Sequence, residues 1–241
     1  MRNVLITVFI ALIFSYIEYR VSEILIKDAE YDYKNINTDN ECKCGKNTEV
    51  IKGLDRKGKI KDKKLLICIF IITATSFFII INSGIEKYKI VSAVFLLPFL
   101  MIASVVDIKT KYIYDMICIS GIVVQMVIAI ALYGFYGLEI FIYGVSVCFL
   151  CSFIIAYITR AMGYGDVFMY AMCGSAISCT EPFNIIPSSF IIACIYCITV
   201  YLVGINKKRI AFAPFITLAG FANIIGFDII KIYMEVIRNI I

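Results

Sequence analysis

Histidine is absent from the 241 residues, and charged residues make up only 17% of them. The absence of histidine excludes catalysis by a Ser-His-Asp triad or a Cys-His pair, and it excludes metal sites with histidine ligands. The scarcity of charge accompanies a hydrophobic content of 61% and a mean hydropathy of +0.91. No soluble domain of this size needs so much apolar surface, whereas a helix bundle in lipid does. The sequence therefore predicts an all-α, polytopic membrane helix bundle.

Eight long apolar runs predict about eight transmembrane helices. They cover residues 4–26, 65–82, 88–106, 113–133, 137–158, 167–181, 185–205 and 210–227. The sixth run is short for a full span, and we expect it to be tilted or partly broken. The first run is long, carries Glu18 and Arg20 near its end and lacks a small-x-small cleavage site. It is therefore expected to be a retained helix rather than a cleaved signal peptide.

The two most polar segments lie outside the apolar runs. Residues 27–64 hold 11 Lys or Arg and 8 Asp or Glu, too polar a composition for a core of their own, and are expected to form a loosely ordered loop. Residues 228–241 place charged and apolar side chains on opposite sides of a helix, which predicts an interfacial amphipathic tail. The predicted organisation is a first transmembrane helix (1–26), the loop, a membrane-embedded core (65–227) and the tail.

The distribution of Lys and Arg predicts the orientation in the membrane. With eight spans, 17 of these residues fall on the side of the 27–64 loop and 5 on the other side. The positive-inside rule then places the loop in the cytoplasm and the N-terminus outside. Asp107 and Asp166 both fall at junctions on the cytoplasmic side. This distribution accounts for the net charge of +5 without a nucleic-acid partner.

Asp107 and Asp166 are the acids that the sequence singles out for chemistry. Asp107 follows the third apolar run, and Asp166 follows two glycines in Gly163-Tyr164-Gly165. Carboxylates at the edge of the hydrocarbon are costly, which makes them candidates for function. Two close carboxylates share a proton, so one activates a water molecule while the other protonates the leaving amine. The pattern therefore suggests aspartyl chemistry.

The glycines and acids also have structural explanations. Glycine adopts positive φ and permits close approach, so Gly163 and Gly165 are expected to form a tight turn that delivers Asp166 to a partner helix. In the alternative interpretation, Asp166 is only an N-terminal helix cap. Asp107 is then an acid at a helix end, beside Lys109 and Lys111.

Three segments resemble type IV prepilin peptidases, which are membrane aspartyl leader peptidases of the GxGD kind. Asp107 to Asp115 resembles their D-x-x-x-x-x-I-P-D stretch, Ala161 to Val167 resembles their G-x-G-D segment, and Ile210 to Gly220 is similar to their late I-P-F-G-P-F-L-x-x-G-G element. The resemblance extends over roughly 88–227. It implies that Asp107 and Asp166 are catalytic, and that Gly163, Gly165 and Asp115 support them.

The resemblance also implies a substrate and a location. Such an enzyme removes the short basic leader of type IV prepilin or pseudopilin precursors at the cytoplasmic face of the cell membrane. Proteolysis needs no cofactor, whereas methylation of the new N-terminus would use S-adenosylmethionine. Tyr114 replaces the family's proline, and Val167-Phe168 lacks the lysine that often follows G-x-G-D, which puts methylation in doubt. Cys42 and Cys44 are half the ligands of a tetrahedral zinc site, so no metal is expected, and their role stays open.

Three alternatives stay open. Asp115 lies eight residues after Asp107, roughly 12 Å along a continuous helix, too far for one shared contact unless the chain folds back. Tyr114-Asp115 followed by G-x-G-D also resembles proteases of the presenilin and signal-peptide-peptidase kind, although Ala213-Pro214-Phe215 stands where they carry Pro-Ala-Leu. The non-enzymatic alternative is a small transporter whose acids bind a cation or relay protons.

Overall fold

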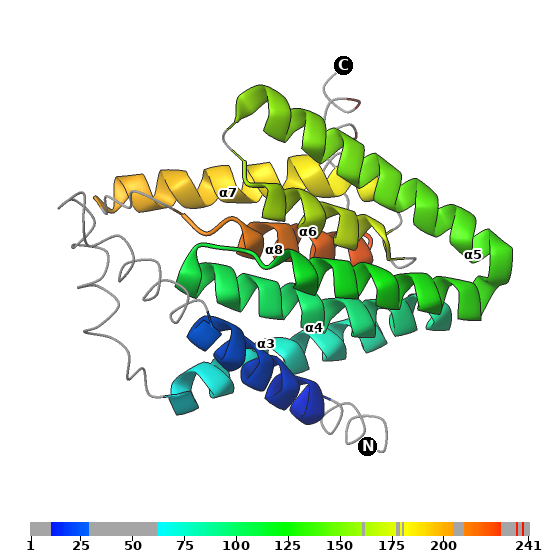
Figure 1. The fold of residues 1–241 in the computed structure, drawn as a ribbon, viewed down its shortest axis with the longest axis horizontal. Helices are drawn as coiled ribbons and strands as arrows, with labels where there is room; N and C mark the ends of the chain where they lie inside the picture. The colour runs from blue at the N-terminus through cyan, green and yellow to red at the C-terminus, as the bar shows by residue number, and fades with distance from the viewer. Residues whose placement is uncertain are drawn as a thin grey trace. The chain divides into compact units, whose positions relative to one another are not determined.

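The described part of the chain is built from helices. The computed structural model describes residues 11–28, 62–160, 162–176, 179, 181–204, 210–227, 235 and 238. A helix covers 11–28. The labelled helices of Figure 1 are α3 (Asp62–Asn82), α4 (Lys87–Thr110), α5 (Asp115–Thr159), α6 (Tyr164–Gly174), α7 (Ile185–Leu202) and α8 (Ala213–Ile224), with a 3₁₀ turn at Pro182–Asn184. The predicted all-α class is confirmed.

Within the described ranges, three stretches of helix are long and apolar enough to cross a membrane. They are Lys87–Thr110, Asp115–Thr159 and Pro182–Leu202, and shorter apolar helices cover Ile67–Asn82 and Ala213–Ile224. A fully apolar helix needs about 20 residues to cross the hydrocarbon. The lengths and composition are those of a helical membrane protein, while the number of eight spans stays a prediction.

Two predicted runs, 113–133 and 137–158, are the two halves of the 45-residue helix α5. Gly134 breaks the helical geometry between them with φ 59° and ψ −135°, values that glycine adopts without strain. In Figure 1 the chain reverses at this turn, and the second half runs back at an angle to the first. The two halves pack closely at Gly137, where an added Cβ would lie 2.1 Å from the carbonyl oxygen of Ala129.

Helix α6 is the buried centre of the unit formed by residues 76–241. It packs mainly against α5 and also contacts α4, α7 and α8. Cys173 of α6 lies beside Gly220 of α8, where an added Cβ would be 3.2 Å from the Cys173 sulfur and 3.7 Å from Leu100 of α4. The predicted run 167–181 is wrong in extent, because α6 ends at Gly174 and the 3₁₀ turn and α7 follow. The short helix holds Asp166 in its first turn.

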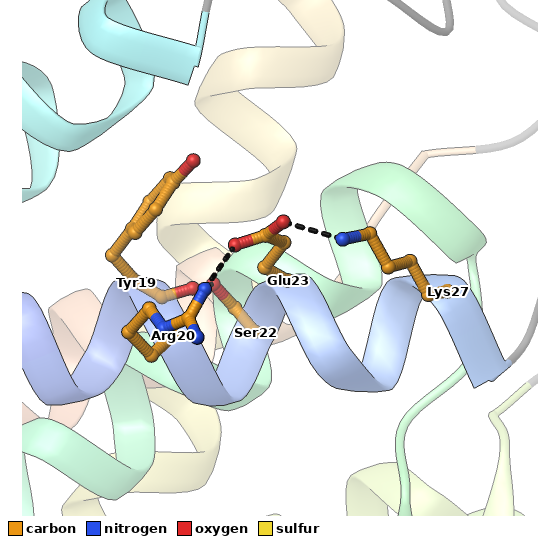
Figure 2. Close-up of polar contacts among 5 residues, drawn as sticks. All are labelled: Tyr19, Arg20, Ser22, Glu23 and Lys27. Carbon is orange, nitrogen blue, oxygen red and sulfur yellow. Dashed lines mark hydrogen bonds and ion pairs between the residues drawn. The ribbon is translucent and has the colours of Figure 1, made fainter.

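Residues 1–75 form a separate compact unit, and the boundary with the second unit falls within α3. In the helix over 11–28, the Glu23 carboxylate forms ion pairs with Arg20 and Lys27, with N–O distances of 3.2 Å and 2.6 Å (Figure 2). Exposed pairs of this kind contribute little to stability, because water and salt screen them. Deeper in the unit, the hydroxyl of Thr73 donates to the buried Glu18 carboxylate at 2.9 Å.

Several predictions lie largely outside the described residues. These are the loose loop over 27–64, of which the two ends (27–28 and 62–64) are helical, the interfacial tail over 228–241, and the roles of Cys42 and Cys44. The N-outside orientation also stays a prediction.

Candidate active site

Asp107 is held between two helices. It lies near the end of α4, is 5% exposed, and its Oδ2 accepts a hydrogen bond of 3.0 Å from the backbone N–H of Ala213. Ala213 is the first residue of α8, so the carboxylate meets the positive end of that helix. One turn deeper, the hydroxyls of Ser104 and Thr217 hydrogen-bond to each other across the same pair of helices. The α4–α8 contact therefore fixes the position of Asp107.

Lys111 ends α4 and turns the chain. Its φ of 59° is left-handed, and its N–H donates to the carbonyl oxygen of Asp107 at 2.8 Å. Helix α5 then starts at Asp115. The helix is interrupted between Asp107 and Asp115, so the roughly 12 Å expected along a continuous helix does not apply to this pair.

Asp115 lies half-buried at the start of α5, where the helix dipole favours a carboxylate. The buried thiol of Cys118, three residues on, lies within electrostatic range of both Asp115 and Asp166. Asp115 is thus at the same end of the helices as Asp166.

Asp166 closes the first turn of α6. Its Oδ2 accepts a hydrogen bond of 3.2 Å from the N–H of Gly163, and its own N–H donates to the Gly163 carbonyl at 3.1 Å. Asp166 therefore does cap the start of α6, as the alternative interpretation expected. The N-cap residue itself is Gly163, and Asp166 is the third helical residue. The expected positive φ is wrong, because Gly163 has φ −74° and Gly165 is helical.

Gly165 does provide the expected close approach. A Cβ there would lie 2.9 Å from the Cβ of Ile113 and 3.3 Å from its carbonyl oxygen. Real Cβ atoms essentially never come within 3.0 Å of a heavy atom to which they are not linked through the neighbouring chain. Ile113 is six residues after Asp107 in the loop between α4 and α5, so this contact draws the start of α6 to the end of α4.

The two carboxylates interact electrostatically. Asp166 lies in α6, which is too short to span the membrane. Burial is the main cause that raises its pKa to about 6. The negative charge of Asp107 raises the pKa further, and the hydrogen bond from Gly163 acts in the opposite direction. A neighbouring carboxylate has this effect only at short range. The fold therefore brings the two predicted acids to one site.

Replacing Gly165 by valine is expected to reduce activity more than it reduces the amount of folded protein. The added Cβ and methyl groups force the Ile113 loop away from α6, which changes the geometry between the two acids. Gly163→Ala is the matched comparison, because its Cβ would meet only the Asp166 carboxylate at an ordinary 3.5 Å. Activity per folded molecule measures the effect, and equal losses in the two variants would contradict it.

The contacts that hold the acids were not predicted from the sequence. These are the Ala213 amide, the Ser104–Thr217 pair and Ile113. The sequence did contain a signal for the Ala213 amide, because Pro214, in the second helical position, is typical of a helix start. In the described ranges, no three Cys, Asp or Glu side chains come together as a metal site would require.

The apolar helices and the two neighbouring carboxylates place the chain among membrane proteins with a buried acidic site. The model of the type IV leader peptidase family matches residues 94–203, which include Asp107, Asp115 and Asp166. Over this segment the chain is similar to type IV leader peptidases, and the resemblance found in the sequence is confirmed. The matched segment ends before α8, so it does not include the Ile210 to Gly220 element. No curated protein and no solved structure matches the chain.

Proposed function

We propose that the protein is an aspartyl endopeptidase that removes the short basic leader of type IV prepilin-like or pseudopilin precursors at the cytoplasmic face of the cell membrane. The observation that supports this most is the electrostatic contact between Asp107 and Asp166, from two helices separated by the whole of α5. The family match supports a peptidase whose substrates are proteins with leader peptides.

The surroundings of the two acids differ, and this difference suggests a role for each. Asp107 accepts from the N–H of Ala213 at the start of α8, an arrangement that stabilises the ionised carboxylate. Asp166 holds its proton up to about pH 6. In the proposed reaction, Asp107 takes a proton from water as the water oxygen attacks the peptide carbonyl carbon. Asp166 then gives its proton to the amide nitrogen as the C–N bond breaks.

Cleavage of a prepilin-like precursor by the purified protein tests this function. The precursor should become shorter by the length of its leader, and the mass of the product should give a single cut site. Adding S-adenosylmethionine tests methylation, which would increase the product mass by one methyl group. An intact precursor with a well-folded protein in a bilayer would contradict the proposal, and proton or cation flux in the same vesicles would favour the transporter.

The activity is expected to decline above about pH 6. Burial and the Asp107 charge raise the pKa of Asp166 to about 6, so the proton that the leaving amine needs is present below this pH and is lost above it. Well above the pKa, kcat/KM should fall about tenfold per pH unit. On the acidic side of the profile, kcat/KM should fall as Asp107 becomes protonated. The two apparent pKa values of the profile belong to the pair of acids and not to either residue alone.

A peptide without titratable side chains near the cut is the suitable substrate for this profile. The measurement is kcat/KM over a range of roughly pH 4 to 9. A profile that stays flat from pH 6 upward would contradict the assignment of Asp166 as the acid.

One observation favours a second candidate, a protease of the presenilin kind that pairs Asp115 with Asp166. Both of these acids lie within electrostatic range of Cys118. Among the described residues, Asp107 has a buried amide contact that Asp115 does not, and this difference is why we prefer Asp107.

A further inference from the structure

A tyrosine on the helix of Asp166 is hydrogen-bonded to the neighbouring helix α7. Tyr170 lies four residues after Asp166, so the two side chains share one side of α6. Tyr170 is fully buried, and its hydroxyl is hydrogen-bonded to the hydroxyl of Ser189, which is also fully buried. Asp166 lies within electrostatic range of the Tyr170 hydroxyl. The helix that carries the proposed acid is thus tied to α7 close to that acid.

Tyr170 is the donor in this hydrogen bond. The Ser189 hydroxyl donates to the carbonyl oxygen of Ile186, one turn earlier in α7, at 2.7 Å. A hydroxyl group has a single hydrogen, so Ser189 can only accept from Tyr170. The donor capacity of Ser189 is therefore satisfied within its own helix, and the bond from Tyr170 joins two helices.

Helix α7 continues this connection to Asp107. It packs against both α6 and α8 (Figure 1). The ring of Phe190, next to Ser189 in the chain, packs against the ring of Phe212, with centroids 5.4 Å apart. Phe212 is the N-cap residue of α8 and precedes Ala213, whose N–H binds the Asp107 carboxylate. Direct contacts therefore run from the helix of Asp166 to the amide that holds Asp107 without passing through α5.

We propose that Tyr170 and Ser189 are positioning residues, whose hydrogen bond holds Asp166 at the separation from Asp107 that the reaction needs. This inference rests on the proposed endopeptidase function. Both side chains are fully buried, so they act through Asp166 and not on the substrate. Hydrogen bonds between membrane helices stabilise one mutual position of the helices. A displacement of reacting groups by about 1 Å can reduce the rate about 100-fold.

Tyr170→Phe tests the proposal in the full-length protein in bilayer vesicles. It removes one oxygen atom and leaves Ser189 bonded to Ile186. We expect kcat per folded molecule on a prepilin-like peptide to fall about 10-fold to 100-fold, with a far smaller change in KM. The alkaline decline of kcat/KM should begin at a lower pH, because a carboxyl group farther from the Asp107 charge holds its proton less firmly.

Ser92→Ala is the matched control, because it also removes one buried hydroxyl that joins two helices. Ser92 of α4 is fully buried and donates to the Oε1 of Gln125 in α5 at 2.7 Å. It precedes Asp107 by roughly 22 Å along the helix. The control should lower the thermal transition and leave kcat per folded molecule unchanged. Equal losses of kcat in Ser92→Ala and Tyr170→Phe would contradict the proposal.

Ser189→Ala tests the other partner of the hydrogen bond. It leaves the buried Tyr170 hydroxyl without this acceptor, so we expect a lower thermal transition than that of Tyr170→Phe. The value of kcat should fall by the same factor as in Tyr170→Phe. The double variant should lose no further activity, because the same hydrogen bond is absent from all three proteins. Losses of kcat that multiply in the double variant would contradict a shared role.

A readout that does not need cleavage separates this proposal from the proposed function. The infrared band of the protonated Asp166 carboxyl group, identified by its absence from Asp166→Asn, is followed against pH. Tyr170→Phe should move its titration to lower pH, while Asp107 and Cys118, the neighbouring titratable groups on α4 and α5, stay in place. An unchanged titration would contradict the positioning role, whatever happens to kcat. If the wild-type protein cleaves nothing, the endopeptidase function fails, and the titration alone decides whether Tyr170 positions Asp166.

Discussion

Replacing Asp166 by asparagine is expected to abolish nearly all cleavage, with kcat reduced roughly 10²-fold to 10⁴-fold. The amide cannot supply the proton that the leaving nitrogen needs. Its side-chain oxygen can still accept the hydrogen bond that Asp166 receives from Gly163, so the first turn of α6 keeps its cap. The loss therefore reports on chemistry rather than on folding.

The control for this prediction measures the fold and the substrate affinity separately. The thermal transition of the Asp166→Asn protein should stay close to that of the wild-type protein, and KM should change far less than kcat. Cleavage within a few-fold of the wild-type rate, from protein with normal stability, would exclude Asp166 as the acid.

Replacing Gly144 by valine is expected to prevent stable folding of the 76–241 unit. A Cβ at Gly144 in α5 would lie 2.0 Å from the carbonyl oxygen of Gly174 in α6, and a Cβ at Gly174 would lie 2.3 Å from the carbonyl oxygen of Gly144. Both contacts are with backbone atoms, which cannot move aside as a side chain does. Close glycine contacts of this type are common where membrane helices cross.

The expected cost exceeds that of ordinary overpacking, which is about 1–3 kcal/mol. Since total stabilities are about 5–15 kcal/mol, we expect little folded protein in the membrane fraction and a transition well below that of the wild-type protein. Ile142→Val is the matched control, because Ile142 is 53% exposed on the same helix and should tolerate valine. A normal yield and transition for Gly144→Val would show that α5 and α6 do not cross at these glycines.

Hydropathy predicts the helices well because each membrane helix satisfies its own backbone hydrogen bonds. The run 185–205 corresponds to α7 (Ile185–Leu202), and the run 88–106 corresponds to most of α4 (Lys87–Thr110). Hydropathy predicts the ends of helices less well. The run 167–181 extended past Gly174, where α6 ends, because hydropathy does not mark the residue at which a helix stops.

The site could be predicted only in part. The sequence singled out Asp107 and Asp166, but their contact depends on tertiary packing that no local pattern contains. The left-handed Lys111 separates Asp107 from Asp115, and lysine rarely takes that conformation, so the sequence did not indicate this turn. The Ala213 amide that binds Asp107 comes from 106 residues further along the chain. The catalytic roles themselves stay predictions.

A direct comparison of Asp107→Asn with Asp115→Asn tests the central claim, which is that Asp107 and Asp166 form the catalytic pair. Each variant is co-expressed with a prepilin-like precursor, and the shift from precursor to mature product is followed on a gel, with membrane levels of the variants matched. We predict no mature product with Asp107→Asn and clear maturation with Asp115→Asn. Maturation by Asp107→Asn together with none by Asp115→Asn would contradict the account and would identify Asp115 as the partner of Asp166.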